Sequence, residues 1–212
     1  MIPRRPFSWT RAGAGVAAAL LIAPRPAEAH LVTTGLGPVY DGISHLLLSP
    51  EDLFPIVALA LLAGLRGPAA GRWALFLLPL AWFAGGLAGL YSAAAPPSTL
   101  AIPALSFLLL GILVASDLRL PTATIAALAL ALGFAHGSLN GMNLRTPPAS
   151  TGVLALLGIM VVLFTLTAIV AALVISLKRP WTRIVVRVAG SWIAAIGLLM
   201  LGWAIHGAGP LR

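Results

Sequence analysis

The sequence contains no cysteine in its 212 residues. This absence excludes disulfide bonds, metal ligation by thiolates and haem attachment through cysteine. Histidine, carboxylate, methionine and amide side chains remain as the available metal ligands. Any metal site in this chain must therefore be rich in nitrogen and oxygen.

Charged residues are scarce as well. They make up 8% of the chain, whereas 60% of the residues are apolar, and the mean hydropathy is +1.03. This composition excludes a soluble globular protein and predicts an integral membrane protein. The net charge of +8 comes from basic residues that stand singly or in pairs between apolar stretches, where they signal topology. We therefore expect the lipid bilayer as a partner and no nucleic acid.

Several enzyme motifs are also missing from the sequence. It has no nucleotide-binding loop, no glycine-rich phosphate cradle, no nucleophile elbow and no His-Glu-x-x-His pattern. Pumping driven by ATP and membrane proteolysis by these routes thus have no support. We expect a protein that is not an enzyme.

The amino terminus has the pattern of a secretory signal. Basic residues precede an apolar run over residues 12–23, and Ala27-Glu28-Ala29 has small residues at the two positions that determine cleavage. The pattern predicts a signal peptide over residues 1–29 and His30 as the first residue of the mature chain. An uncleaved first helix is the alternative, and both interpretations export His30.

The rest of the chain consists mainly of apolar stretches separated by short polar loops. We expect an all-α, polytopic membrane protein with about six transmembrane helices, a bundle over residues 53–206 and a tail over 207–212. The six predicted spans are 53–65, 73–95, 100–116, 121–141, 151–177 and a last one that ends near His206.

The first span is short for a membrane crossing. Residues 53–65 would extend roughly 20 Å as a helix, and a hydrocarbon core is about 30 Å thick. The preceding stretch, from Pro38 to Leu48, is predicted to be a helix of about three turns. We expect residues 30–52 to form an exoplasmic or re-entrant segment, because interrupted helices of this kind often carry ion sites in transporters.

The basic residues predict the orientation. If His30 is exported, seven lie on the cytoplasmic side and two on the other, which agrees with the positive-inside rule. The two sets are Arg66, Arg72, Arg119, Lys178, Arg179, Arg183 and Arg187, against Arg145 and Arg212. The sequence thus predicts a multi-pass protein of a bacterial inner membrane, with the mature amino terminus and the carboxyl terminus in the periplasm.

The polar residues of the apolar body gather near the predicted periplasmic face. His136, Asn140 and Asn143 follow an i, i+4, i+7 pattern, so they form one stripe on a helix. Asp41 and His45 are four residues apart, a spacing that lets both side chains bind one ion. An interhelical hydrogen bond is the alternative role for His136.

Three further residues complete the predicted ligand set. A cleaved chain would add the α-amine and imidazole of His30, while Glu51 and Asp52 follow Ser49 and Pro50 at a helix start, where capping is their alternative role. His206 is interpreted as an interfacial histidine. The candidate metal ligands are His30, Asp41, His45, Glu51, Asp52, His136, Asn140 and Asn143.

Glycines at positions 133, 137 and 141 recur at four-residue spacing. A helix face of this kind lets a neighbouring helix approach closely. We interpret the repeat as a packing feature.

Three stretches of the sequence resemble the HupE/UreJ family of hydrogenase and urease accessory membrane proteins. They are Gly37-Pro-Val-Tyr-Asp-Gly-Ile-Ser-His45, Ser49-Pro-Glu-Asp-Leu53 and Gly133-Phe-Ala-His-Gly137. The resemblance implies a nickel or cobalt permease, with His136 as the first residue to carry over, followed by His45 and Asp41.

These observations predict a membrane permease for a divalent transition-metal ion that enters from the periplasmic face. Nickel is favoured, and cobalt, copper or zinc stay open. The alternatives are a metal-binding or assembly factor that does not transport, and a structural membrane subunit. The metal ion, a second copy of the chain and metalloenzyme maturation proteins are the expected partners besides lipid.

Overall fold

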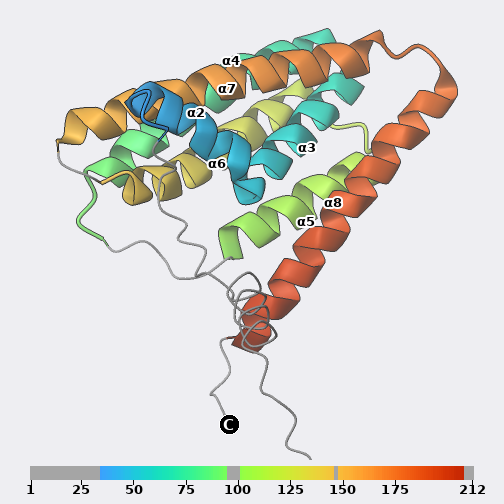
Figure 1. Cartoon of the computed structure of the whole chain (residues 1–212). Coiled ribbons are helices and arrows are strands. Elements are labelled where there is room, and N and C mark those ends of the chain that lie inside the picture. The colour runs from blue at the N-terminus through green and yellow to red at the C-terminus, as the bar shows by residue number, and fades with distance from the viewer. Residues whose placement is uncertain (1–33, 95–100, 146–147, 208–212) are drawn as a thin grey trace, which may run out of the picture. The chain divides into compact units, whose positions relative to one another are not determined.

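A computed structural model describes residues 34–94, 101–145 and 148–207. These residues form seven helices and no strand, so the predicted all-α class is confirmed (Figure 1). The helices are α2 (Pro38–Leu48), α3 (Pro50–Arg66), α4 (Pro68–Leu90), α5 (Ala101–Ser116), α6 (Thr122–Asn143), α7 (Ala149–Ser176) and α8 (Pro180–Gly207). The predicted signal peptide lies outside the described residues.

Four of these helices begin at a proline, whose fixed φ suits the first turn and whose missing N–H is not needed there. The predicted helix from Pro38 to Leu48 is confirmed, and so is the helix start at Pro50. Ser49 separates the two helices and accepts backbone hydrogen bonds at the start of α3, but its side chain makes no capping bond. The axes of α2 and α3 differ by 75° at this break.

The six predicted spans correspond to α3 through α8, but not all of these helices are long enough to cross a bilayer alone. By length and composition, α4, α6, α7 and α8 qualify singly, and α2 with α3 qualifies as one bent pair. Helix α5 is apolar and has 16 residues, which is below the usual length of a span. The described helices therefore provide four or five candidate spans and one shorter apolar helix.

The glycine face of α6 packs directly on the backbone of α4. A Cβ atom on Gly133 would lie 2.6 Å from the carbonyl oxygen of Leu78, and one on Gly137 or Gly141 would collide with the α4 backbone as well. Residues without a Cβ are therefore required along this contact, as expected for small-residue packing in membranes. The interpretation of the glycine repeat as a packing feature is confirmed.

Helix α3 occupies the centre of the described part of the chain. It contacts each of the other six described helices, whereas α2 packs mainly on α7, and α5 packs mainly on α8. Large side chains such as Trp82 and Phe107 are fully or almost fully buried around it. Asp52, a buried polar residue of α3, is consequently held away from both water and lipid.

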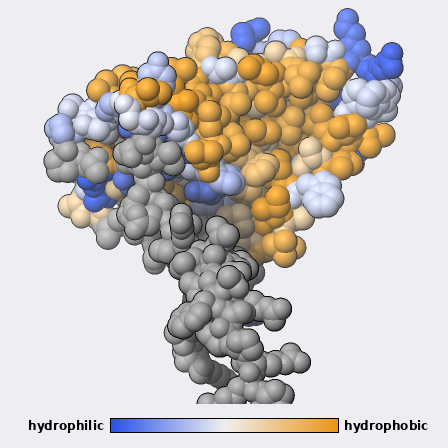
Figure 2. Space-filling view, in the orientation of Figure 1, coloured by the Kyte–Doolittle hydropathy of each residue, from blue (hydrophilic) through white to orange (hydrophobic). Residues whose placement is uncertain are grey.

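The outer surface of the helices is strongly apolar. Large side chains on α8, among them Trp192, Leu199 and Trp203, are more than two-thirds exposed. The face seen in Figure 2 is covered broadly by hydrophobic residues. A contiguous apolar surface of this kind is expected for helices in contact with lipid.

Candidate functional site

The most deeply placed acid of the described chain is Asp52, in the first turn of α3. The residue is 4% exposed. The amino-terminal end of a helix favours a negative charge, because its free N–H groups carry the positive end of the helix dipole. A carboxylate inside an apolar bundle still requires direct partners, since its burial without hydrogen bonds is costly.

Two residues of α6 provide those partners. The Nδ1 atom of His136 lies 2.7 Å from Oδ1 of Asp52, and Nδ2 of Asn140 donates to Oδ2 of Asp52 at 2.8 Å. His136 is fully buried and Asn140 is 3% exposed. The predicted i, i+4 pair on α6 thus faces the protein interior, where it meets an acid 84 residues away in sequence.

The second ring nitrogen of His136 is also occupied. Its Nε2 atom lies 3.0 Å from Oγ of Ser106 on α5, and the same hydroxyl lies 2.9 Å from the carbonyl oxygen of Ile102. The hydroxyl has one hydrogen, so it can donate to Ile102 or to His136 at any moment, but not to both. With Asp52 ionised, Nδ1–H of His136 donates to the carboxylate in either arrangement, and Nε2 is the nitrogen whose bonding can change.

An amide oxygen beside this pair has no partner. Oδ1 of Asn140 is buried and accepts no hydrogen bond from any described residue. The orientation of the amide is fixed, because its Nδ2 also donates to the backbone carbonyl of His136 at 3.2 Å. A buried acceptor without a donor is costly, and it can be satisfied by a water molecule or a cation.

Trp82 of α4 forms one wall of the site. Its ring packs against the imidazole of His136 with centroids 5.5 Å apart, and its Nε1 atom is buried without a partner among the described residues. Trp82 and Ser106 are not among the residues predicted from the sequence. Their positions inside apolar spans, away from the helix ends where indole and hydroxyl groups are usual, could have indicated such a role.

Asp41 and His45 lie on α2, and the structure gives Asp41 a local role. Its Oδ1 atom accepts hydrogen bonds from the backbone N–H of Thr34 at 2.6 Å and from the Thr34 hydroxyl at 2.7 Å. These bonds hold the turn that leads into α2. Within residues 34–94, 101–145 and 148–207, no hydrogen bond joins Asp41 or His45 to the Asp52 cluster.

The remaining predicted residues lie apart from the buried cluster. Glu51 and Asn143 are exposed, and exposed His206 interacts through Nδ1 with the carbonyl oxygen of Gly202. His30 lies outside the described residues. The described part of the chain contains no group of three or more histidine, aspartate or glutamate residues that could hold a metal.

The structure thus brings together three of the eight predicted ligands. Asp52, His136 and Asn140 form one buried polar cluster, with Ser106 and Trp82 against the imidazole. A carboxylate that accepts from one ring nitrogen of a histidine leaves the other nitrogen to bind a metal, which is a frequent arrangement around metal ligands. The metal roles of all eight residues stay predictions.

Comparison with known proteins gives two matches. A family model described as "HupE / UreJ protein" matches residues 18–200. A relative from Rhizobium leguminosarum bv. viciae, described as "Protein HupE", is 29% identical over 188 residues, which cover 86% of this chain and 94% of the relative. No solved structure matches the chain.

Proposed function

The chain belongs to the HupE/UreJ family, whose members are accessory and transport membrane proteins rather than enzymes, and on this premise we propose that it is a membrane permease for a divalent transition-metal ion. Nickel is the favoured cargo and cobalt the second. Both ions accept imidazole ligands, and neither requires the thiolates that this sequence lacks.

The observation that carries this proposal is the buried cluster of Asp52, His136 and Asn140. The metal would bind Nε2 of His136 in place of the Ser106 hydroxyl, while Nδ1–H keeps its bond to Asp52 and so fixes the ring. The unpaired Oδ1 of Asn140 offers an oxygen ligand in the same cluster. No other group of buried side chains in the described residues combines these donors.

The composition of the cluster suits passage better than storage. One imidazole, one carboxylate that is already hydrogen-bonded and one neutral amide oxygen make a weak site. A transported ion must bind well enough to enter and weakly enough to leave. A permanent metal centre would need the closed shell of strong ligands that the described residues do not provide.

We propose entry from the periplasmic face through residues 30–52. Asp41, His45, Glu51 and His30 are the candidate ligands along this entry segment, and the break at Ser49 turns the chain from α2 toward the buried cluster. The orientation rests on the asymmetry of basic residues between loops. In the same orientation the carboxyl terminus is periplasmic.

The direct test is uptake of Ni²⁺ into proteoliposomes that contain the purified full chain. His136→Ala should reduce the initial rate at least tenfold, because it removes the one imidazole of the cluster. Asp52→Asn should reduce it by a similar factor, since the ring loses its charged partner. His206→Ala, which removes an exposed histidine with a backbone contact only, is the matched control and should keep the wild-type rate.

Calorimetric titration of the same proteins with Ni²⁺, Co²⁺, Cu²⁺ and Zn²⁺ separates binding from transport. If the protein binds metal through His136 but shows no uptake, it is a metal-presenting factor and the proposed permease function is wrong. Wild-type uptake and binding in both the His136 and the Asp52 variants would refute the cluster as a metal site.

A further inference from the structure

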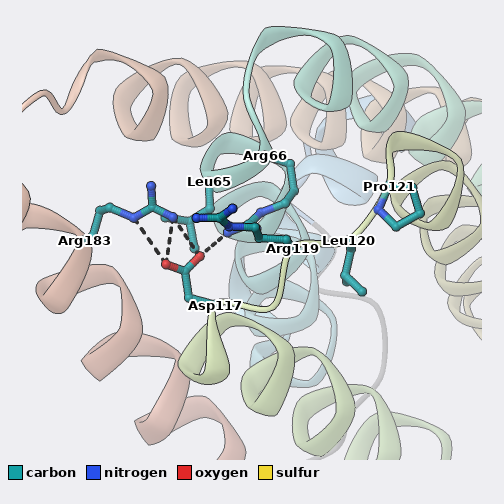
Figure 3. A pocket seen from close by; sticks show the side chains of 7 residues that line it. All are labelled: Leu65, Arg66, Asp117, Arg119, Leu120, Pro121 and Arg183. Atoms are coloured by element: carbon teal, nitrogen blue, oxygen red, sulfur yellow. Dashed lines mark hydrogen bonds and ion pairs between the residues drawn. The ribbon is translucent and has the colours of Figure 1, made fainter.

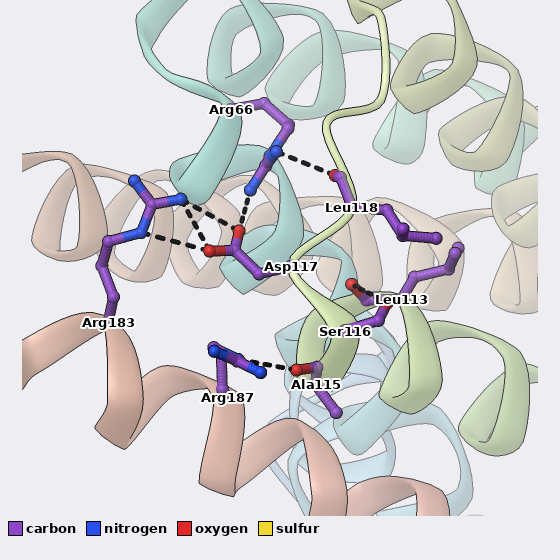
Figure 4. A network of polar contacts seen from close by, with 8 residues as sticks. All are labelled: Arg66, Leu113, Ala115, Ser116, Asp117, Leu118, Arg183 and Arg187. Atoms are coloured by element: carbon purple, nitrogen blue, oxygen red, sulfur yellow. Dashed lines mark hydrogen bonds and ion pairs between the residues drawn. The ribbon is translucent and has the colours of Figure 1, made fainter.

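A second polar cluster lies at the opposite end of α3 from Asp52. Asp117, in the loop after α5, accepts hydrogen bonds from Arg66 at the end of α3 and from Arg183 in the first turn of α8 (Figure 4). Nη2 of Arg183 lies 2.7 Å from Oδ2 and 3.0 Å from Oδ1 of Asp117, and its Nε lies 3.2 Å from Oδ2. One carboxylate thus binds two guanidinium groups.

These residues line an open pocket of about 750 Å³. Arg119 joins Arg66, Asp117 and Arg183 in its lining, and Figure 3 draws the four charged side chains around the same space. Three guanidinium groups face one carboxylate, so the pocket has a formal excess of two positive charges. A cation is repelled from such a pocket, and an anion is attracted to it.

Arg66 has one N–H donor that makes no hydrogen bond within the described residues. Its side chain is 7% exposed, and its Nε atom is buried without a hydrogen-bond partner in the described ranges. Arg119 makes no hydrogen bond to any residue that the structure describes. A buried guanidinium with an unpaired N–H is costly in free energy unless a further acceptor is bound.

Hydrogen bonds within the chain hold the lining of the pocket in place. Nη1 of Arg66 donates to the carbonyl oxygen of Leu118 at 2.8 Å, and Nε of Arg187 donates to that of Ala115 at 2.8 Å. The first bond fixes the loop that carries Asp117, and the second fixes the last turn of α5 before it. The φ of +52° at Asp117 requires such support. Side chains that are already held in place lose little conformational entropy when a ligand binds.

We propose that this pocket binds a phosphate group. Guanidinium groups match phosphate oxygens in charge and in the geometry of paired N–H donors, and a phosphate supplies the acceptors that Arg66 and Arg119 lack. The pocket lies where α3 and α5 end and α6 and α8 begin, at the level of lipid headgroups if these helices lie in a bilayer. An anionic phospholipid and free inorganic phosphate are the two sources of such a group.

The test uses the full chain in detergent and distinguishes the two sources. Native mass spectrometry after exchange into mixed micelles measures retention of phosphatidylglycerol against phosphatidylcholine. Thermal unfolding in lipid-free detergent, with and without inorganic phosphate, measures binding of the free anion. Arg119→Gln removes one pocket charge without breaking a bond within the described residues, and Arg72→Gln removes an equal charge from an exposed position on α4 outside the pocket lining.

We expect selective retention of phosphatidylglycerol, weakened roughly tenfold by Arg119→Gln and unchanged by Arg72→Gln, because one charge-assisted contact is lost. Stabilisation by inorganic phosphate alone, lost in Arg119→Gln, would keep the phosphate site and reject the lipid as its source. If neither probe binds, or if both variants weaken binding equally, the pocket has no specific phosphate site.

Discussion

Asp52 and Asp117 are two acids in opposite environments. Asp52 accepts hydrogen bonds from a histidine and an amide, both buried. Asp117 is paired with two arginines, of which Arg183 has a side chain that is 54% exposed. The first cluster carries no excess of permanent positive charge and leaves an oxygen acceptor free. The second has more positive than negative charge and leaves a donor free.

The difference shows that the hydrogen-bonding partners of a carboxylate determine whether its site can bind a cation or an anion. A neutral histidine can bind a metal through one ring nitrogen, whereas a guanidinium stays positively charged and has only hydrogen-bond donors. The same acid type is therefore part of the proposed cation site at one end of α3 and of the proposed anion pocket at the other. The two clusters also differ in access to solvent, so their contributions to the free energy of unfolding can be measured separately.

The largest expected effect is that of removing Asp52. Asp52→Ala leaves buried donors of His136 and Asn140 without acceptors, and should lower the free energy of unfolding by about 3–5 kcal/mol. Asp117→Ala should cost less, about 2–3 kcal/mol, because the half-exposed Arg183 can find water instead, while Arg66, whose side chain is 7% exposed, keeps its bond to the carbonyl oxygen of Leu118. Equilibrium unfolding in mixed micelles measures both, and equal losses would contradict the difference between the two clusters.

A methyl group on Gly137 should have the next largest effect. Gly137→Ala places a Cβ against the carbonyl oxygen of Trp82, forces α4 and α6 apart, and should cost about 1–3 kcal/mol. Nickel binding should fall while phosphate binding at Arg119 is retained, since the packing contact lies beside His136. Gly202→Ala is the control, because a Cβ there meets nothing within 4 Å. Loss of both activities together would mean that the two regions are not independent.

High salt should change the stability contribution of the Asp117 cluster but not that of the Asp52 cluster. At 1 M ionic strength the Debye length is about 3 Å, so partly exposed pairs are screened and buried ones are not. The stability difference between wild type and Asp117→Ala should shrink by a few tenths of a kcal/mol. The corresponding difference for Asp52→Ala should not change. A salt-sensitive Asp52 effect, measured by the same unfolding titration, would indicate that water reaches this acid.

Among the substitutions in the two clusters, removal of the Ser106 hydroxyl has the smallest expected effect. Ser106→Ala removes the partner of Nε2 on His136 and should cost about 1 kcal/mol or less. Ser138→Ala is the matched control, because this hydroxyl bonds the carbonyl oxygen four residues earlier on α6 in the same way as Ser106 does on α5. If Nε2 is the metal-binding atom, Ser106→Ala should leave calorimetric nickel affinity equal or higher. A tenfold weaker affinity would instead assign the hydroxyl to the ligand set.

Much of the fold could be predicted from the sequence. The prolines at positions 38 and 50 suit the first turn of a helix, so α2 and the start of α3 were predicted correctly. Proline alone is not a sufficient signal, because Pro55 and Pro79 lie inside helices. The number of membrane spans was harder to predict. It depends on how the short α3 and α5 are accommodated, and hydropathy alone does not determine this.

The site could be predicted only in part. Spacing on one helix predicts that His136 and Asn140 share a face. It does not identify the helix opposite, which depends on contacts between residues far apart in sequence. Topology grouped His136 with Asp41 and His45, because all three were expected at one membrane face. In the structure α2 packs mainly on α7, and the start of α3 supplies the acid instead.

The glycine repeat of α6 has a consequence for the axial register of the helices. Glycines of α4, at positions 85 and 89, face α6 at the same four-residue interval. Sliding one helix along the other by four residues, about 6 Å, would again set glycine against backbone. Such a repeat determines the distance between α4 and α6, but it does not determine which of several positions along α4 the helix α6 occupies. The bonds from Asp52 to His136 and Asn140 align α6 with α3, and only Gly67 separates α3 from α4. The polar cluster therefore selects one of these translations and gives this fold a single alignment.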